Sequence, residues 1–272
     1  MLAARLVGLL PDLSAVESLE VSRIYSAAGL LPGGRPLRRP PSREPHHSAS
    51  LPALVGGGGK ARPGEISLAH HGVLFLDELP EFSRAALEAL RQPLETGRVS
   101  IARAAAHVTY PARFQLVAAM NPCRCGYIGD ALRECRKAPR CAEDYMARIS
   151  GPLLDRMDLH VAMQPYEPLS YMTEAEGEST QAVAARVATA RHQQATRQGD
   201  VVNAVAALDS LQVSPAAQDM AQSVAARFRF SARGYTRLLR VARTIADLAA
   251  EAWVEPAHVA EAATFRVRGG GQ

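Results

Sequence analysis

Two adjacent carboxylates at the end of an apolar run are the strongest candidates for chemistry in this sequence. Residues 72–76 read Gly-Val-Leu-Phe-Leu, and Asp77 and Glu78 follow directly. A short apolar run after a turn predicts a buried strand, and parallel sheets bind ligands at the carboxyl ends of their strands. There Asp77 would hold Mg²⁺, which favours carboxylates and phosphate oxygens, and Glu78 would orient and deprotonate an attacking water. This is a Walker B pattern; the alternative is a buried strand followed by two solvated acids.

Asn121 follows a second apolar run. Residues 114–120 predict another buried strand, which ends at Asn121-Pro122. If this strand neighbours the first, the Asn121 amide would lie at the same sheet edge as Asp77 and Glu78. The chain between Asp77 and Asn121 leaves room for one helix and a hairpin. The alternative is that Asn-Pro simply begins a turn.

Arginines at two further places could stabilise phosphate charge. Arg156 follows a predicted short helix and precedes a predicted strand, and Arg148 is the competing candidate nearby. A guanidinium given to a γ-phosphate stabilises the transition state, by about 10³–10⁵ in rate where such arginines have been studied. Arg233 opens a predicted helix near the C-terminus. The alternatives are surface ion pairs for the first two, and a solvated basic face with Arg237 and Arg240 for Arg233.

All four cysteines of the chain lie within residues 123–141. Cys123, Cys125, Cys135 and Cys141 form the pattern C-x-C-x9-C-x5-C. Such a cluster in a cytosolic chain suggests a metal rather than disulfides. Four thiolates suit a structural, tetrahedral Zn²⁺, and the alternative is free thiols.

The elements that must position these residues alternate between strands and helices, which predicts a parallel α/β sheet. Helices are predicted at residues 1–10, 14–28, 83–94 (ended by Pro93) and 181–197; a hairpin pairs 99–101 with 107–110; and residues 151–163 hold a short helix and a third strand. Ser14 and Glu17 form a predicted capping box at the second helix. Residues 167–180 read as a linker, and residues 207–268 as all-helical, with helix starts at Ser214-Pro215 and Glu255-Pro256.

The Gly-rich run that ends at Lys60 is not a phosphate-binding loop. No strand precedes it, no Ser or Thr follows Lys60, and residues 61–63 (Ala-Arg-Pro) cannot open a good helix. We therefore expect residues 36–59 to form an irregular or hairpin-like insertion.

The composition fits a globular chain with a real core, since 47% of its residues are hydrophobic and 21% are charged. No run of about 18 apolar residues is present, so no transmembrane helix is expected. The N-terminus reads as an amphipathic helix rather than a signal peptide, which favours the cytoplasm. We attribute the net charge of +4 to an Arg-rich composition without a special partner; the alternative is a surface that contacts polyanions such as nucleic acid.

Taken in order, these blocks resemble the ComM/YifB magnesium-chelatase-like AAA+ ATPases. The matching blocks are residues 45–50, 53–58, 70–82, 121–126, 148–160 and 231–248. The resemblance covers essentially the whole chain. It implies an α/β fold with three parts: a parallel-sheet AAA+ core at 1–166, a linker and amphipathic helix at 167–200, and a small all-helical lid domain at 201–272.

The resemblance also implies roles. Asp77 would bind Mg²⁺ and nucleotide, Glu78 and Asn121 would act in hydrolysis, Arg156 would be the arginine finger, and Arg233 would sense nucleotide from the lid. The implied cofactors are ATP and Mg²⁺. The implied partners are further copies in a hexameric ring and DNA bound without sequence preference, as in branch-migration helicases of natural transformation, with no membrane partner.

The resemblance further implies a predicted hairpin that faces the pore of the ring. It carries Arg98, Arg103 and His107. Arginine contacts with phosphates would be salt-dependent and largely independent of sequence. The alternative is an exposed hairpin with ordinary charges.

Family members carry an N-terminal domain and then a Walker A loop, G-x-x-x-x-G-K-[ST], and this pattern does not occur in the 272 residues. Because that loop holds the β- and γ-phosphates, we expect the chain alone to bind ATP weakly and to turn it over little or not at all. A core without its first strand should also expose a sheet edge and lose stability. Two other functions remain open: the ATPase subunit of a metal chelatase, and a non-enzymatic, truncated, zinc-binding remnant.

Overall fold

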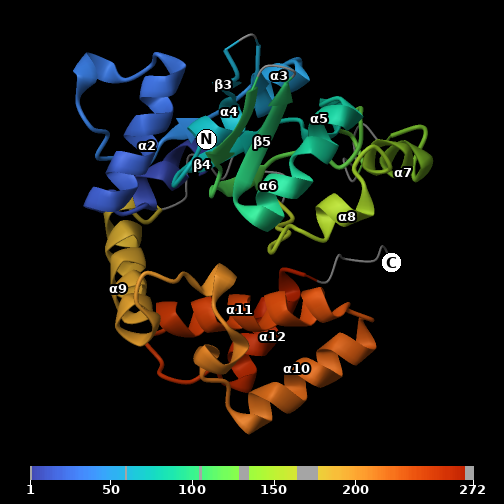
Figure 1. The fold of residues 1–272 in the computed structure, drawn as a ribbon. Helices are drawn as coiled ribbons and strands as arrows, with labels where there is room; N and C mark the ends of the chain where they lie inside the picture. The colour runs from blue at the N-terminus through green and yellow to red at the C-terminus, as the bar shows by residue number, and fades with distance from the viewer. Residues whose placement is uncertain (1, 59, 104–105, 129–134, 164–176, 267–272) are drawn as a thin grey trace. The chain divides into compact units, whose positions relative to one another are not determined.

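The computed structural model describes residues 2–58, 60–103, 106–128, 135–163 and 177–266 (Figure 1). The chain divides into two compact units, Met1–Arg156 and Met157–Gln272. Among the described residues, no helix is both long and apolar enough to span a membrane.

A three-stranded parallel sheet forms the centre of the first unit. Its order is β1 (Ser42–Arg43), β4 (Val73–Leu76) and β7 (Gln115–Ala118), with β4 in the middle. Val73 pairs with Gln115 and Leu76 with Ala118. A central strand covered on both faces is apolar without alternation, and three of the four residues of β4 are buried.

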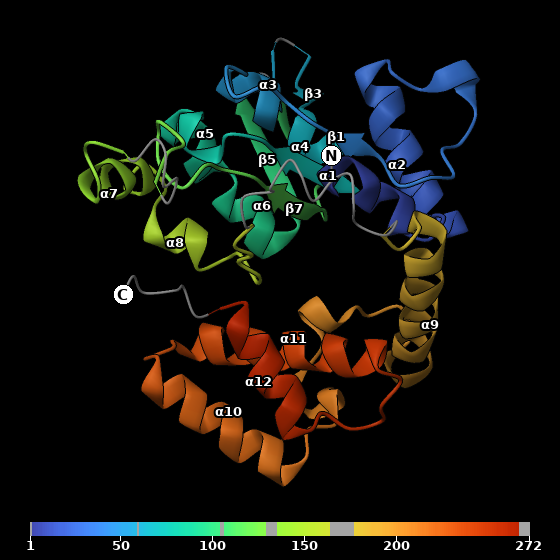
Figure 2. The ribbon, with the colours of Figure 1, turned by 180° about the vertical axis from the view of Figure 1, so that it is seen from behind.

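The first unit also contains two small antiparallel sheets and eight α-helices among its described residues. The small sheets pair β2 (Gly56–Gly57) with β3 (Arg62–Pro63) and β5 (Arg98–Arg103) with β6 (Ala106–Pro111). The helices are α1 (Leu2–Leu6), α2 (Ala15–Ala28), α3 (Leu51–Val55), α4 (Glu65–Leu68), α5 (Arg84–Ala89), α6 (Arg91–Thr96), α7 (Arg140–Met146) and α8 (Gly151–Leu154). Figure 2 shows α5, α7 and α8 grouped together.

Several predicted elements are confirmed. The capping box at Ser14 and Glu17 begins α2. The hairpin pairs Val99 with Tyr110 and Ile101 with Val108, as predicted. The apolar runs before Asp77 and Asn121 are β4 and β7, and they are neighbours. The predicted linker lies largely in residues 164–176, which are outside the described part of the chain.

The prediction of an irregular insertion at residues 36–59 is wrong in part, since it contains β1 and α3, although β2 and β3 do form a hairpin. β1 is only two residues long, too short to give a sequence pattern. Arg43 anchors it, because its guanidinium forms two bonds to the Glu65 carboxylate at the start of α4, 2.5 and 2.7 Å long. Gly72 permits the approach, since a Cβ there would collide with the carbonyl oxygen of Pro41.

Two predicted boundaries are wrong. Pro93 does not end a helix but lies in the first turn of α6, where its missing N–H is not needed. Residues 155–163, all of which the structure describes, form no strand. Leu159, Val161 and Met163 alternate as a strand would, yet they are 52%, 64% and 70% exposed. A strand needs a partner for its backbone groups, and no described strand pairs with this segment.

The second unit is helical. It contains α9 (Thr180–Gln198), α10 (Pro215–Arg227), α11 (Ala232–Leu248) and α12 (Pro256–Thr264). The helix starts at Ser214-Pro215 and Glu255-Pro256 are confirmed. The buried core draws on α10, α11 and α12 and includes Leu238, Leu239 and Val259.

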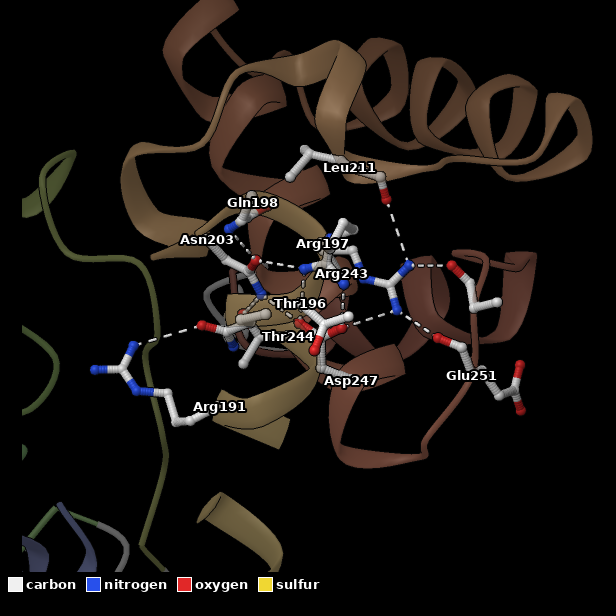
Figure 3. A network of polar contacts seen from close by, with 12 residues as sticks. Arg191, Thr196, Arg197, Gln198, Asn203, Leu211, Arg243, Thr244, Asp247 and Glu251 are labelled. Carbon is white, nitrogen blue, oxygen red and sulfur yellow. Dashed lines mark hydrogen bonds and ion pairs between the residues drawn. The ribbon is translucent and has the colours of Figure 1, made fainter. Parts of the chain in front are cut away.

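A buried polar network joins α9 to α11 (Figure 3). Arg243 is fully buried, and its guanidinium donates to the carbonyls of Glu251 and Ala252 and pairs with Asp247. Asp247 also pairs with Arg197 at 2.7 Å and accepts from the amide of Asn203 at 2.7 Å. Both guanidinium groups pair with the Asp247 carboxylate, which offsets part of the desolvation cost of the cluster, although Nε of Arg197 and Nε of Arg243 are buried without a hydrogen-bond partner.

Candidate functional site

The predicted acidic pair lies at the carboxyl end of β4. The ladder continues past the strands: the Ala119 N–H donates to Leu76 O and the Leu79 N–H donates to Ala119 O, both at 3.0 Å. The ends of β4 and β7 are therefore held together, and Asp77 and Asn121 leave the sheet at the same edge. Asp77, Glu78 and Asn121 are all exposed there, where they are accessible to a ligand.

A tight turn fixes the backbone of the acidic pair. Glu78 has a left-handed conformation, with φ of 51°, and its N–H donates to Asp77 Oδ1 at 2.9 Å. The following 3₁₀ turn, Leu79–Glu81, is anchored by Leu79 and Phe82, each 2% exposed. Strained backbone of this kind clusters at functional sites. The two exposed carboxylates thus stand on a buried apolar support.

His47 is a neighbour of Glu78 that the sequence analysis missed. Its Nδ1 lies 3.0 Å from Glu78 Oε2. The ring lies edge-on to Phe82, with centroids 6.5 Å apart, and 4.0 Å from the ring of His46. Residues 45–50 were assigned to an insertion, and only the folding of the segment after β1 onto β4 brings His47 to this site.

Both arginine-finger candidates form ion pairs within the first unit. Arg156 Nη2 lies 2.6 Å from Glu95 Oε2, and its Nη1 donates to the carbonyl of Pro152 at 2.7 Å. Arg148 Nη1 lies 2.8 Å from Glu81 Oε2. Glu81 belongs to the turn that follows Glu78, so Arg148 is tied to the acidic edge. The ion-pair alternative therefore has identified partners for both arginines, and their roles remain predictions.

Arg233 lies near the start of α11 in the second unit, with an exposed side chain. Its basic neighbours have partners in that unit: Arg237 pairs with Asp158 at 2.9 Å, and Arg240 donates to the carbonyl of Ala206. Because Arg233 and Asp77 belong to different units, their joint action on a nucleotide stays a prediction.

The four cysteines come together, as the predicted metal site requires. The four Sγ atoms all lie within 4.8 Å of one another, and none of the four cysteines forms a disulfide bond. The Sγ atoms of Cys123 and Cys125 are 3.3 Å apart. Cys123 and Cys135 are buried, and Cys125 is exposed. Four sulfurs this close in a partly buried loop match the donor set of a tetrahedral thiolate site.

The backbone around Cys123 favours a thiolate. Burial opposes ionisation of Cys123, but the Cys125 thiol and the N–H groups of Ile128, Tyr127 and Gly126 bond to its sulfur and lower its pKa to about 7. For Cys125, the bond from the Tyr127 N–H lowers the pKa of the thiol. The thiols of Cys123, Cys135 and Cys141 outweigh this bond and raise the pKa of Cys125 to about 12. The first proton therefore leaves near neutral pH, and a cation would be needed to hold several thiolates together.

A second cluster, of Glu20, His70 and His71, is structural. Nδ1 of His70 accepts from the Arg113 N–H at 3.0 Å, so its Nε2 carries the proton and donates to Glu20 Oε2 at 3.1 Å. A metal-bound histidine normally donates its other ring N–H, which His70 cannot do here. Burial, and then the nearby His71, lower the pKa of His70 to about 4. The neutral ring ties α2 to the start of β7.

An acidic pair at the edge of a parallel sheet, in an α/β unit followed by a helical unit, is the architecture of an AAA+ core with its helical domain. Comparison with known families agrees. A model described as "Magnesium chelatase, subunit ChlI" matches residues 1–171, and "Magnesium chelatase, subunit ChlI C-terminal" matches residues 177–266. The chain belongs to this magnesium-chelatase-like family.

Curated relatives match almost the whole chain. An uncharacterized protein of Mycobacterium tuberculosis is 48% identical over 278 residues, covering 99% of this chain and 55% of the relative. Uncharacterized protein YifB of Escherichia coli is 44% identical, and competence protein ComM of Haemophilus influenzae is 42% identical, each covering 98% of this chain and 53% of the relative. The chain spans about half the length of the curated relatives it matches.

Proposed function

We propose that this chain is part of an ATP-hydrolysing motor, with its catalytic site at the joined ends of β4 and β7. The observation that carries the proposal is that Asp77, Glu78 and Asn121 leave one sheet edge together, although 42 residues separate Glu78 from Asn121. Family membership supports an ATPase of this type. The site is exposed, as an ATP site shared with another subunit requires.

The side chains fit a magnesium nucleotide. Two exposed carboxylates offer the oxygen ligands that Mg²⁺ prefers, together with the phosphates themselves. Bound there, Mg²⁺ would neutralise phosphate charge. Asp77 would bind the metal, Glu78 would take a proton from the attacking water, and Asn121 would orient that water against the γ-phosphate. His47 would hold the Glu78 carboxylate through its Nδ1 atom.

The arginine finger and the lid arginine complete the proposed site. In a hexameric ring, Arg156 of one copy would reach the γ-phosphate bound by its neighbour, and Arg233 of the lid would contact the nucleotide. Reaching out would require Arg156 to leave Glu95, and the competing Arg148 to leave Glu81. The Arg148 side chain is 43% exposed, and exposed ion pairs are worth about 0–1 kcal/mol, so Arg148 could be released at low cost. Arg156 is only 11% exposed and also donates to the carbonyl of Pro152, so its release would cost more.

The proposed work of the motor is the remodelling of DNA. The β5–β6 hairpin presents Arg98 and His107 at exposed positions, and the side chain of Arg103 is outside the described part of the chain. Lysine- and arginine-type contacts to phosphates bind DNA without reading its sequence. The name of the Haemophilus relative, a competence protein, favours a role in transformation over a chelatase subunit, and branch migration is our proposal for that role. A cytoplasmic location stays a prediction.

We also propose Zn²⁺ as the resident metal of the four cysteines. Thiolate ligands in a tetrahedral set select zinc over the harder cations. Its role would be structural, since all four positions are filled by the protein. If the chain were a non-enzymatic remnant, this zinc centre would be its remaining activity.

The test of the motor is ATP hydrolysis by the chain joined to the preceding segment of a relative, with and without DNA. Glu78→Gln should lower kcat by about 10²–10⁴ and leave nucleotide binding intact. Glu44→Gln, at an exposed position, is the matched control and should change nothing. Equal hydrolysis by wild type and Glu78→Gln would exclude Glu78 as the base.

A further inference from the structure

The cysteine cluster begins two residues after Asn121 of the proposed hydrolysis site. Asn121 stands between two anchors in the chain: the backbone bond from the Ala119 N–H to Leu76 O on one side, and Cys123 on the other. Cys123 is fully buried. Only two peptide units separate it from Asn121, so fixing the Cys123 sulfur restricts where the Asn121 amide can point.

The cluster also reaches the opposite side of the site through α7. Cys141 lies in the first turn of α7, and its N–H donates to Lys137 O at 2.9 Å. The buried Tyr145 lies on the same helix, and its neighbour Asp144 lines a hollow together with Phe82, the residue that follows the acidic turn, so α7 lies beside the acidic edge. Two residues beyond α7, Arg148 pairs with Glu81.

A metal bound by all four sulfurs would therefore cross-link the Asn121 loop to α7. The connection runs from Asn121 through the cluster to α7 and Arg148, and returns through Glu81 to the turn that bears Glu78. Every step is a covalent neighbour or a described contact within the first unit. Without the metal, four thiols exert no such constraint, because thiol–thiol hydrogen bonds are weak.

We propose that the metal centre positions the Asn121 side chain, so that the site hydrolyses ATP efficiently only when zinc is bound. The proposal deepens the proposed function and rests on it for the role of Asn121. In this proposal the four cysteines fix the position of Asn121 at the sheet edge, and their main role is not the stability of the whole unit. Loss of zinc should therefore act like loss of the Asn121 amide.

The first measurement establishes the metal itself. The purified chain should contain one zinc per molecule by elemental analysis, and replacement by Co²⁺ should give the absorption of a four-thiolate tetrahedral site. Cys125→Ser should weaken metal binding, whereas Lys137→Ser, at a non-ligand position beside the cluster, should not. A chain without bound metal in both tests would overturn the zinc assignment and this inference, and would leave the motor proposal standing.

The second measurement separates positioning from general stability. Hydrogen exchange of the chain, zinc-loaded and chelator-treated, should show faster exchange at residues 119–121 and in α7 after zinc removal. The β5–β6 hairpin, which lies outside the proposed connection, should not change. A zinc-loaded chain whose residues 119–121 exchange equally without zinc would overturn the inference while the zinc assignment survives.

The third measurement is a double-variant cycle in the hydrolysis-competent, extended chain. Cys125→Ser and Asn121→Ala should each lower kcat by a similar factor at unchanged KM, and the double variant should fall no further, as expected of residues acting as a unit. Cys141→His, which keeps a zinc ligand, should retain kcat and zinc and guards against effects of misfolding. Multiplicative losses in the double variant would contradict positioning through Asn121.

Discussion

His47 Nδ1 lies 3.0 Å from Glu78 Oε2, so an imidazole from the segment after β1 contacts the carboxylate at the end of β4. Glu78 projects from a left-handed backbone position into an exposed edge, where little else would fix its side chain. We therefore expect His47 to orient the general base. The contact links two segments that no local sequence pattern connects.

His47→Ala should lower kcat by up to about fivefold with little change in KM. The reason is that the His47 and Glu78 side chains are 33% and 50% exposed; a pair this exposed is worth about 0–1 kcal/mol, and each 1.36 kcal/mol lost from the transition state is a factor of ten. His46→Ala is the matched control, because His46 is exposed and bonds Ser48 rather than Glu78. Equal activity of the two variants would show that the His47 contact is incidental.

The stability of the first unit should fall as the pH drops from about 6.5 to about 4. Burial, and next the charge of His71, lower the pKa of His70 from its ordinary 6.5 to about 4. In this window the unfolded chain binds a proton that the folded chain excludes, so acid favours unfolding, by up to about 3 kcal/mol. Above pH 6.5 both states hold a neutral ring, and His70 adds no pH dependence.

His70→Asn should reduce the loss of unfolding free energy between pH 6.5 and 4, because asparagine keeps an acceptor for the Arg113 N–H without titrating. Chemical denaturation at a series of pH values measures the effect, with His46→Asn as the exposed control. Glu20, whose pKa is lowered mainly by its bond to His71, loses its contribution only below its ordinary value of 4.5. An unchanged slope between pH 6.5 and 4.5 in His70→Asn would contradict the assignment.

The buried network of Figure 3 should dominate the stability of the second unit. Asp247→Ala leaves Arg243 buried without its carboxylate, and breaking a buried pair on one side costs about 3–5 kcal/mol. Arg186→Ala removes an ion pair whose side chains are 57% and 61% exposed, and should cost less than about 1 kcal/mol. Denaturant unfolding compares the two; similar small losses would mean that the network is solvated in solution.

The sequence predicted the elements whose residues carry a local signal. Each of these signals depends only on residues close in the sequence. They are the apolar runs of β4 and β7, the capping box of α2, and the Ser-Pro and Glu-Pro helix starts. The parallel pairing of β4 with β7 followed from the alternation of strands with helices. The clustering of the cysteines followed from their spacing.

Contacts between distant segments were not predictable in the same way. β1 has two residues, and Arg43 and Gly72 hold it in place through partners elsewhere in the chain. His47 meets Glu78, and Arg156 meets Glu95, only after folding. The third strand was predicted within residues 151–163, but a strand also requires a pairing partner, which a pattern within one segment cannot reveal.

The most direct test of the account is the binding of a fluorescent ATP analogue with Mg²⁺. The 272-residue chain should be compared with the same chain preceded by the phosphate-loop segment of a relative. We predict weak binding by the chain alone, tight binding by the extended chain, and loss of that binding in its Asp77→Ala variant. Absence of binding by the extended chain, or binding unaffected by Asp77→Ala, would contradict the assignment of the nucleotide site to the joined ends of β4 and β7.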